Sequence, residues 1–384
     1  MSRKIWIATI TEALNSLHPY AEIMKNAFKF DHAIDKYVIY SSFPVAGSLA
    51  SQFSSIENFA IWQESRLADF TGNLKTWGLK PLEIELMAGN IGPSGSGKPA
   101  TASIRNYIIL EALSAGVEII LFLGEKVWPS ILVDGGAEGP ELREVDVIGS
   151  HLEFLHTHND LLASTSWFTG YHIPIFQHNE DYMKILEDFL QQDPAVRFPA
   201  VQREYCLEHI VNTTFCNTRH LALDLGKAAI LPPFFSSSLL LDKEIHHGLL
   251  EGTIWGTLLA KNRARCIDID LLLYEDLFPE SEHPPAPANP AISELLFQHL
   301  RGICIDLPLL EQLSSQLQTD YLFSRDKFHL YLRAWCRNTS RFYLDKRYLQ
   351  LPKIYKAACR NLKQNSSRLE SLQSLWPKLI NRFS

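Results

Sequence analysis

Short apolar runs alternate with amphipathic stretches along the first third of the chain. Four of these runs predict strands, near residues 5–10, 37–41, 83–87 and 118–123. The stretch between the first two, HPYAEIMKNAFKF, has the spacing of a helix. Because helical stretches connect the strands, we expect all four in one mainly parallel sheet with covered faces. Ligands of such sheets bind outside the carboxyl ends of the strands.

The last third of the chain has a different pattern. Residues 279–291 contain five prolines and predict a surface linker, since proline interrupts both helices and central strands. Beyond the linker, apolar residues recur at three- and four-residue spacing, as in amphipathic helices. We therefore divide the chain into an α/β domain at 1–278, the linker, and an all-helical module at 292–384.

The composition is that of an ordinary globular protein, with 384 residues, 46% of them hydrophobic and 21% charged. There is no run of about 18 apolar residues, and the first residues lack the apolar core and cleavage site of a secretory signal. We expect a cytoplasmic protein with no transmembrane segment, and leave peripheral contact with a membrane open. Six scattered cysteines without a C-x-x-C pair favour buried thiols over a zinc site or a disulfide framework.

Charge is distributed unevenly along the chain. The formal net charge is −7, but residues 321–384 hold 14 Lys and Arg against 3 Asp and Glu, leaving 22 basic and 40 acidic residues before them. Such a basic segment is typical of a module with an anionic partner: a nucleic acid, an acidic lipid surface, or the protein's own acidic domain.

A glycine-rich segment, GPSGSGKP, has the spacing of a phosphate-binding P-loop, with Lys98 at the lysine position. That loop needs a Ser or Thr hydroxyl after the lysine to hold magnesium, and Pro99 stands there instead. A P-loop kinase or ATPase is therefore disfavoured. What remains is a glycine-rich turn that leads into a helix, which several nucleotide-binding folds share.

The residues from Gly97 onward, GKPATASIRNYIILEALSAGVEIILFLGEKVWP, resemble the central segment of GT-A glycosyltransferases, especially family-2-like enzymes. The matching residues are IRN at 104–106 and EALSAG at 111–116, followed by an apolar strand. The family's strand ends in D-x-D, whereas this one ends in Gly124, Glu125 and Lys126.

A second segment, EIHHGLLEGTIWGTLL, is similar to the acceptor-side motif of the same family. Glu251 matches the family's Glu, and Gly252 replaces its Asp. The resemblance covers roughly residues 4–275 and implies a GT-A-like, mainly parallel sheet with flanking helices as a nucleotide-sugar domain, followed by the helical module.

The resemblance also implies a chemistry. Sugar transfer from a nucleotide sugar releases a diphosphate, whose charge a divalent metal or cationic side chains must stabilise. Glu125 could supply one oxygen ligand to Mg or Mn, while Lys126, Lys98 and Arg105 could neutralise phosphate directly. Metal-dependent and metal-independent transfer therefore both remain open.

The expected donor site collects residues at the strand ends and around the glycine loop: Thr9, Ser41, Gly97, Lys98, Arg105, Glu125 and Lys126. The acceptor hydroxyl needs a general base, and the motif favours Glu251, with His246 and His247 as alternatives. Arg105 and Glu125 also have ordinary interpretations, as a helix contact and a solvated loop acid.

Two functions remain open from the sequence. The first is a glycosyltransferase with an unidentified donor and acceptor, and with basic helices that contact an anionic partner or a membrane surface. The second is a GT-A-derived binding or scaffold subunit without transfer chemistry, which both altered acid motifs favour. The histidines of SHLEFLHTHND, at 151, 156 and 158, lack a one-face ligand pair, and we expect them at the surface.

Overall fold

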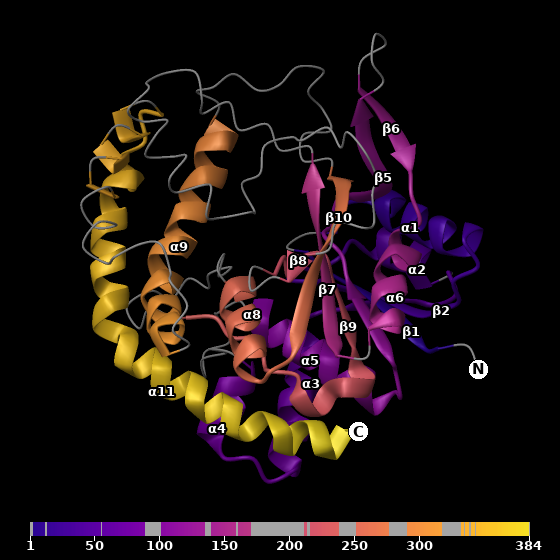
Figure 1. Ribbon diagram of the computed structural model, residues 1–384, viewed down its shortest axis with the longest axis horizontal. Coiled ribbons are helices and arrows are strands. Elements are labelled where there is room, and N and C mark those ends of the chain that lie inside the picture. Colours follow the sequence, from indigo (N-terminus) through magenta and orange to yellow (C-terminus); the bar gives the residue numbers. More distant parts are fainter. Residues whose placement is uncertain are drawn as a thin grey trace.

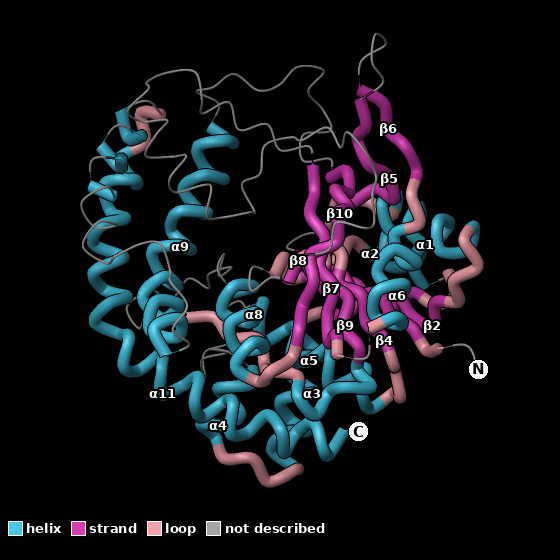
Figure 2. The backbone as a smooth tube through the Cα atoms, viewed as in Figure 1, coloured by secondary structure: helices cyan, strands magenta, loops and turns pink. Residues whose placement is uncertain are grey.

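The computed structural model describes most of the chain, and Figure 2 colours the described part by secondary structure. The described residues are 3–11, 14–54, 56–88, 101–134, 140–158, 160–169, 211–212, 216–237, 251–275, 290–316 and 332–383, apart from 334, 338 and 342. Four predicted site residues lie outside them: Gly97, Lys98, His246 and His247.

The described strands form one sheet in the order β3-β2-β1-β4-β9-β7-β10-β5-β6, with β8 beside β10 (Figure 1). Their bounds are β1 Ile5–Thr11, β2 Ile34–Ser41, β3 Phe59–Trp62, β4 Ile119–Phe122, β5 Val127–Asp134, β6 Pro140–Glu144, β7 Leu161–Thr169, β8 Val211–Asn212, β9 Leu221–Asp224 and β10 Arg265–Glu275. β1, β2, β3, β4, β7 and β10 run in the same direction, and β9 and β5 run against them. The sheet is therefore mixed but mainly parallel.

Three of the four predicted strands are confirmed in this sheet, as β1, β2 and β4. The strand predicted at 83–87 is wrong, because those residues belong to α4 (Pro81–Ala88), and β3 is the sheet's third strand. The run LEIELM fits two periods. Pro81 suits the first turn of a helix, and the Glu83 carboxylate accepts the Lys80 backbone N–H at 2.7 Å. Helix α4 then buries Met87 among helices rather than against a strand.

Helices cover both faces of the sheet (Figure 1). On one face lie α1 (His18–Lys29), α2 (Gly47–Ser54) and α6 (Val147–Thr157), which share a buried apolar cluster with Ile7 and Ile39. The other face packs against α3 (Glu64–Thr76), α4, α5 (Thr101–Ser114) and α8 (Glu251–Lys261). A sheet whose strands are buried on both faces explains why the strand sequences are nearly continuous apolar runs.

The described C-terminal residues are helical, as predicted: α9 (Pro290–Gln316), the short η5 (Lys346–Gln350) and the long α11 (Leu351–Phe383). Their apolar side chains belong to the same buried cluster as α5 and α8. The Trp376 indole donates to the Leu231 carbonyl at 2.9 Å, and the Phe383 ring meets Trp77 edge-on at 4.8 Å. The helices therefore share a core with the sheet domain.

The predicted architecture is confirmed: a mainly parallel sheet with flanking helices, followed by helices at the C-terminus. The domain boundaries stay a prediction, since most of the proposed linker lies outside the described residues. Within the described residues, no helix is long and apolar enough to cross a bilayer.

Candidate functional site

The order of the strands places a topological switch point between β1 and β4. Strands β2 and β3 follow β1 on one side, whereas β4 lies on its other side, so the crossover direction reverses there. At such a switch point the loops after the two neighbouring strands separate and leave room for a ligand at their carboxyl ends. The residues just after β1 and β4 are therefore the first candidates for contact with a ligand.

Thr11 and Glu125 meet across this switch point. Thr11 ends β1, and Glu125 lies in the tight turn between β4 and β5. The Thr11 hydroxyl donates to the Glu125 carboxylate, and the Ser42 N–H donates to the Thr11 carbonyl at 3.1 Å. The ends of β1, β2 and β4 are thus held together, with the partly exposed Glu125 carboxylate between them.

Two of the predicted donor-site residues lie deeper than expected. Thr9 is inside β1, fully buried, with its hydroxyl 3.1 Å from the Tyr37 hydroxyl. Ser41 ends β2 as predicted, but its buried hydroxyl donates to the Phe43 carbonyl at 2.8 Å and closes the following turn. Thr11, two residues beyond Thr9 on the same face of the strand, is the threonine whose hydroxyl contacts Glu125, and the sequence analysis missed it.

Strand β9 brings a second set of charged residues to the same edge. Because β9 is antiparallel to β4, with Leu221 opposite Phe122, the residues that precede β9 lie beside those that follow β4. Arg219 and His220 occupy this place, and the Arg219 guanidinium donates to the carboxylate of Glu275 at the end of β10. The sequence analysis missed all three residues.

The Glu275 carboxylate is completely buried at this edge, while the Arg219 side chain remains 35% exposed. Burial raises the pKa of Glu275. The positive charge of Arg219 opposes this shift, the negative charge of Glu125 adds to it, and the positive charge of Lys126 opposes it more weakly. These interactions place two cations and two carboxylates within electrostatic range of one another. Lys126 itself is partly exposed in the turn after β4.

The side chains of Glu275 and His220 lie close to the backbone at Gly124. A Cβ atom at Gly124 would lie 2.8 Å from the Glu275 carboxylate and 3.0 Å from the His220 Nε2. No side chain fits there without moving a buried group. The D-x-D motif of the resembling family would begin at this position, where the neighbouring carboxylate of Glu275 fills the space that an aspartate side chain would need.

His220 and His151 are buried and are not surface residues. The prediction of a surface position is therefore wrong for His151, whose Nδ1 lies 2.8 Å from the Ser164 hydroxyl and whose ring is buried between α6 and the sheet. Burial lowers the pKa of His151 to about 3. Burial, followed by the positive charge of Arg219, holds the pKa of His220 well below its usual range. Both imidazoles are therefore neutral near pH 7.

Arg105 and Glu251 form a second buried ion pair, on the α5 side of the sheet. The Arg105 guanidinium donates to the Glu251 carboxylate, and the two side chains are 6% and 2% exposed. The same guanidinium lies 5.9 Å from the Phe122 ring centroid and 5.7 Å from that of Phe234. The structure thus joins two residues predicted for separate roles, phosphate contact and general base, to each other.

Asn106 and Gly252, which follow Arg105 and Glu251 in the sequence, both make close contacts with the backbone of other segments. The Asn106 amide donates to the Phe234 carbonyl and accepts the Phe234 N–H, both at 2.8 Å, and so fixes the segment after β9. A Cβ atom at Gly252 would lie 1.8 Å from the Cys216 carbonyl oxygen. Glycine is required there because α8 approaches the backbone at 216 so closely.

A divalent metal needs several oxygen ligands, and the described residues do not supply them. Within this part of the chain, no three His, Cys, Asp or Glu side chains gather in a way that could hold a metal ion. The Glu125 carboxylate accepts from Thr11, and Glu275 is paired with Arg219. The described donor set therefore does not fit Mg or Mn, and Glu125 offers one ligand at most.

Comparisons with known proteins give distant structural similarities. No protein-family model matches the chain, and no curated protein does. A solved structure described as a mycobacterial protein is 10% identical, covers 83% of this chain and 76% of that chain, and has a TM-score of 0.39.

Two further structures are of glucosyl-3-phosphoglycerate synthase from Mycobacterium tuberculosis. The complex with Mn2+, UDP and phosphoglyceric acid is 11% identical and covers 83% of this chain and 80% of that chain. The complex with Mn2+ and UDP-glucose is 12% identical and covers 83% and 81%. Both have a TM-score of 0.39.

Proposed function

We propose that this protein is a glycosyltransferase that binds a nucleotide sugar at the switch point between β1 and β4. The observation that carries the proposal is the meeting of Thr11 and Glu125 at the switch point, beside the cations of Lys126 and Arg219. Partly exposed cations beside a carboxylate suit a reaction in which a diphosphate leaves while an acceptor loses a proton.

The cations have the role of stabilising the leaving group. As the bond from the sugar's anomeric carbon to the diphosphate oxygen breaks, the diphosphate keeps the electron pair and gains negative charge. Lys126 lies in the turn after β4, and Arg219 just before β9, so both stand at the carboxyl edge of the switch-point strands. The Arg219 guanidinium is paired with Glu275, and because its side chain is 35% exposed it can also pair with phosphate.

We assign Glu125 as the general base that takes the proton of the acceptor hydroxyl. A new bond forms from the acceptor oxygen to the anomeric carbon, and the acceptor proton passes to a base. Glu125 is partly exposed, whereas Glu251 is enclosed with Arg105. That enclosure argues against the predicted role of Glu251 as the base and supports a role in holding α5 against α8.

The test combines binding and turnover. Isothermal titration with UDP-, GDP- and dTDP-sugars identifies the donor, and donor hydrolysis with and without EDTA measures the chemistry and its metal dependence. With the donor identified, Glu125→Gln should lower turnover by about 10²-fold or more with little change in donor affinity. Glu251→Gln serves as the comparison, and a larger loss of turnover per folded molecule there would return the base to Glu251.

A binding or scaffold subunit without transfer activity is the second candidate. Gly252 packs on the Cys216 carbonyl, so the position after Glu251 carries no carboxylate. The charge of Glu251 is itself compensated by the Arg105 guanidinium. Donor binding without hydrolysis or transfer, across the whole sugar-nucleotide panel, would favour this function.

A further inference from the structure

The last two helical elements of the chain present one continuous basic face to solvent. Exposed residues recur at intervals of three, four, three, four and three from η5 into α11. They are Lys346, Leu349, Lys353, Lys356, Arg360 and Lys363. This spacing places all six on the same face of the helix, and we call them the basic stripe.

The opposite face of the helix is buried, so the stripe has a rigid support. Tyr348, Leu351, Tyr355 and Ala358 alternate with the stripe and lie in the core. Figure 1 shows α11 along the outer edge of the molecule, beside α9. The helix therefore cannot turn its apolar face outward, and a partner has to meet the basic stripe itself.

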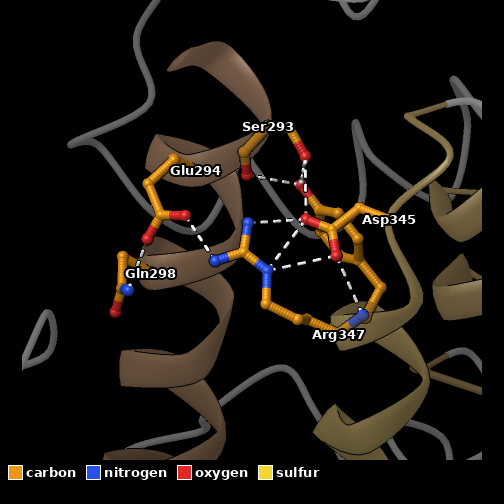
Figure 3. A network of polar contacts seen from close by, with 6 residues as sticks. Ser293, Glu294, Gln298, Asp345 and Arg347 are labelled. Carbon is orange, nitrogen blue, oxygen red and sulfur yellow. Dashed lines mark hydrogen bonds and ion pairs between the residues drawn. The ribbon is translucent and has the colours of Figure 1, made fainter. Parts of the chain in front are cut away.

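Acidic residues are absent from this part of the sequence. Between Lys346 and Leu369 there is no Asp or Glu, and Glu370 is the first acid after the stripe. Arg347 is separate, because its guanidinium faces α9 and donates to Glu294 at 2.5 Å and to Asp345 at 2.6 Å (Figure 3). That network fixes η5 on α9, and among the described residues no ion pair joins an acid to a residue of the stripe.

Two leucines accompany the basic residues. Leu349 is 47% exposed within the stripe, and Leu344 is 89% exposed in the turn just before it. Leu344 is two residues from Lys346, so their Cα atoms lie within roughly 7 Å. Leu344 has a φ of +53°, in the left-handed region that residues other than glycine seldom adopt. The turn is braced by the Tyr343 ring, stacked on Tyr348 with centroids 6.0 Å apart.

We propose that the basic stripe, with Leu344 and Leu349, docks the protein on an anionic lipid surface. Lysine and arginine would contact acidic headgroups, and the two leucines would enter the boundary between headgroups and acyl chains. Aliphatic side chains favour lipid over nucleic acid, because single strands are bound on aromatic rings and duplexes through phosphate and base contacts. This docking is independent of the proposed transfer reaction.

The test is co-sedimentation of the full chain with phosphatidylcholine vesicles, with and without phosphatidylserine, over a salt series. We expect binding to the anionic vesicles alone, weakened by salt. Changing Lys353, Lys356, Arg360 and Lys363 to Gln should lower the partition coefficient by about 10²-fold or more. A matched variant loses four exposed lysines elsewhere, Lys75, Lys80, Lys261 and Lys378, and should bind within a few-fold of the unchanged protein.

A second pair of variants separates lipid from other polyanions. Leu344→Ser should lower vesicle binding several-fold and leave binding to a DNA duplex unchanged, whereas Leu82→Ser, at a leucine 63% exposed on α4, should change neither. Equal binding to neutral and anionic vesicles, or equal losses in the two four-charge variants, would overturn the proposal. Tighter binding to the duplex than to vesicles, with no effect of Leu344→Ser, would replace lipid by nucleic acid.

Discussion

The two buried arginine–glutamate pairs differ in their access to solvent. Arg105 and Glu251 are both enclosed, between α5, α8 and two phenylalanine rings. Glu275 is equally buried, but its partner Arg219 is about one third exposed at the carboxyl edge of the sheet. In this arrangement the closed pair joins α5 to α8, and neither member is exposed to a ligand. The half-open pair can hold the fold and still offer one charge to a phosphate.

Removing one member of the closed pair gives the largest expected effect. Glu251→Ala should lower the free energy of unfolding by about 3–5 kcal/mol, because it leaves the Arg105 guanidinium buried without this carboxylate. Chemical denaturation followed by circular dichroism measures the change. Asp160→Ala, which removes a partner of Arg265 in an exposed pair, is the control and should leave stability nearly unchanged. Similar losses in both variants would contradict the structural role of the closed pair.

Next in size are the effects at the two glycines, one beside each pair. Gly252→Ala should destabilise by about 1–3 kcal/mol or more, because the added carbon meets the Cys216 carbonyl of the backbone. Gly124→Ala should cost less, because the atoms it meets belong to the side chains of Glu275 and His220. Thermal unfolding of both variants ranks them, and the reverse order would mean that the switch-point edge is the more rigid of the two regions.

A smaller effect is expected from the open pair. Arg219→Ala should weaken binding of a nucleotide sugar by about 10-fold, since one charge-assisted contact to the diphosphate is lost. Isothermal titration of the donor measures it, and Arg219→Lys, which keeps the charge, should retain part of the affinity. Unchanged affinity in Arg219→Ala, with lower stability, would make this pair structural too.

The smallest effect concerns pH. The raised pKa of Glu275 means that the folded protein holds this proton more tightly than the unfolded chain does. The contribution of Glu275 to stability is thus present below its unfolded pKa of about 4.5 and is lost as pH rises through the folded value. The stability of Glu275→Gln, relative to the unchanged protein, should therefore increase with pH above about 4.5. Denaturant midpoints of both proteins over a pH series test this, and parallel curves would contradict it.

What the sequence predicted well were features with a local pattern. The strands β1, β2 and β4 and the helix α5 have apolar runs or spacings that specify them within a few residues. α4 was misread because LEIELM alternates like a strand while its burial follows a helix, and only packing among helices decides between them.

The site was less accessible to sequence reasoning, because its contacts are long-range. Arg219 and Glu275 are 56 residues apart and belong to no common motif, and an antiparallel strand brings them together. Arg105 and Glu251 were each found through a family-like segment, but their pairing across 146 residues was not. A signal for Glu275 did exist, since it is an acid at the end of an apolar strand.

The direction of β9 also bears on how this protein could be redesigned. Since β9 runs against its neighbours, the turn before it and the turn after β4 face each other at one edge, although the segments are far apart in sequence. A library of variants confined to Glu125, Lys126 and Arg219 would therefore alter a single surface from two independent stretches of gene. None of the three is fully buried, so ligand preference could be selected without rebuilding the core.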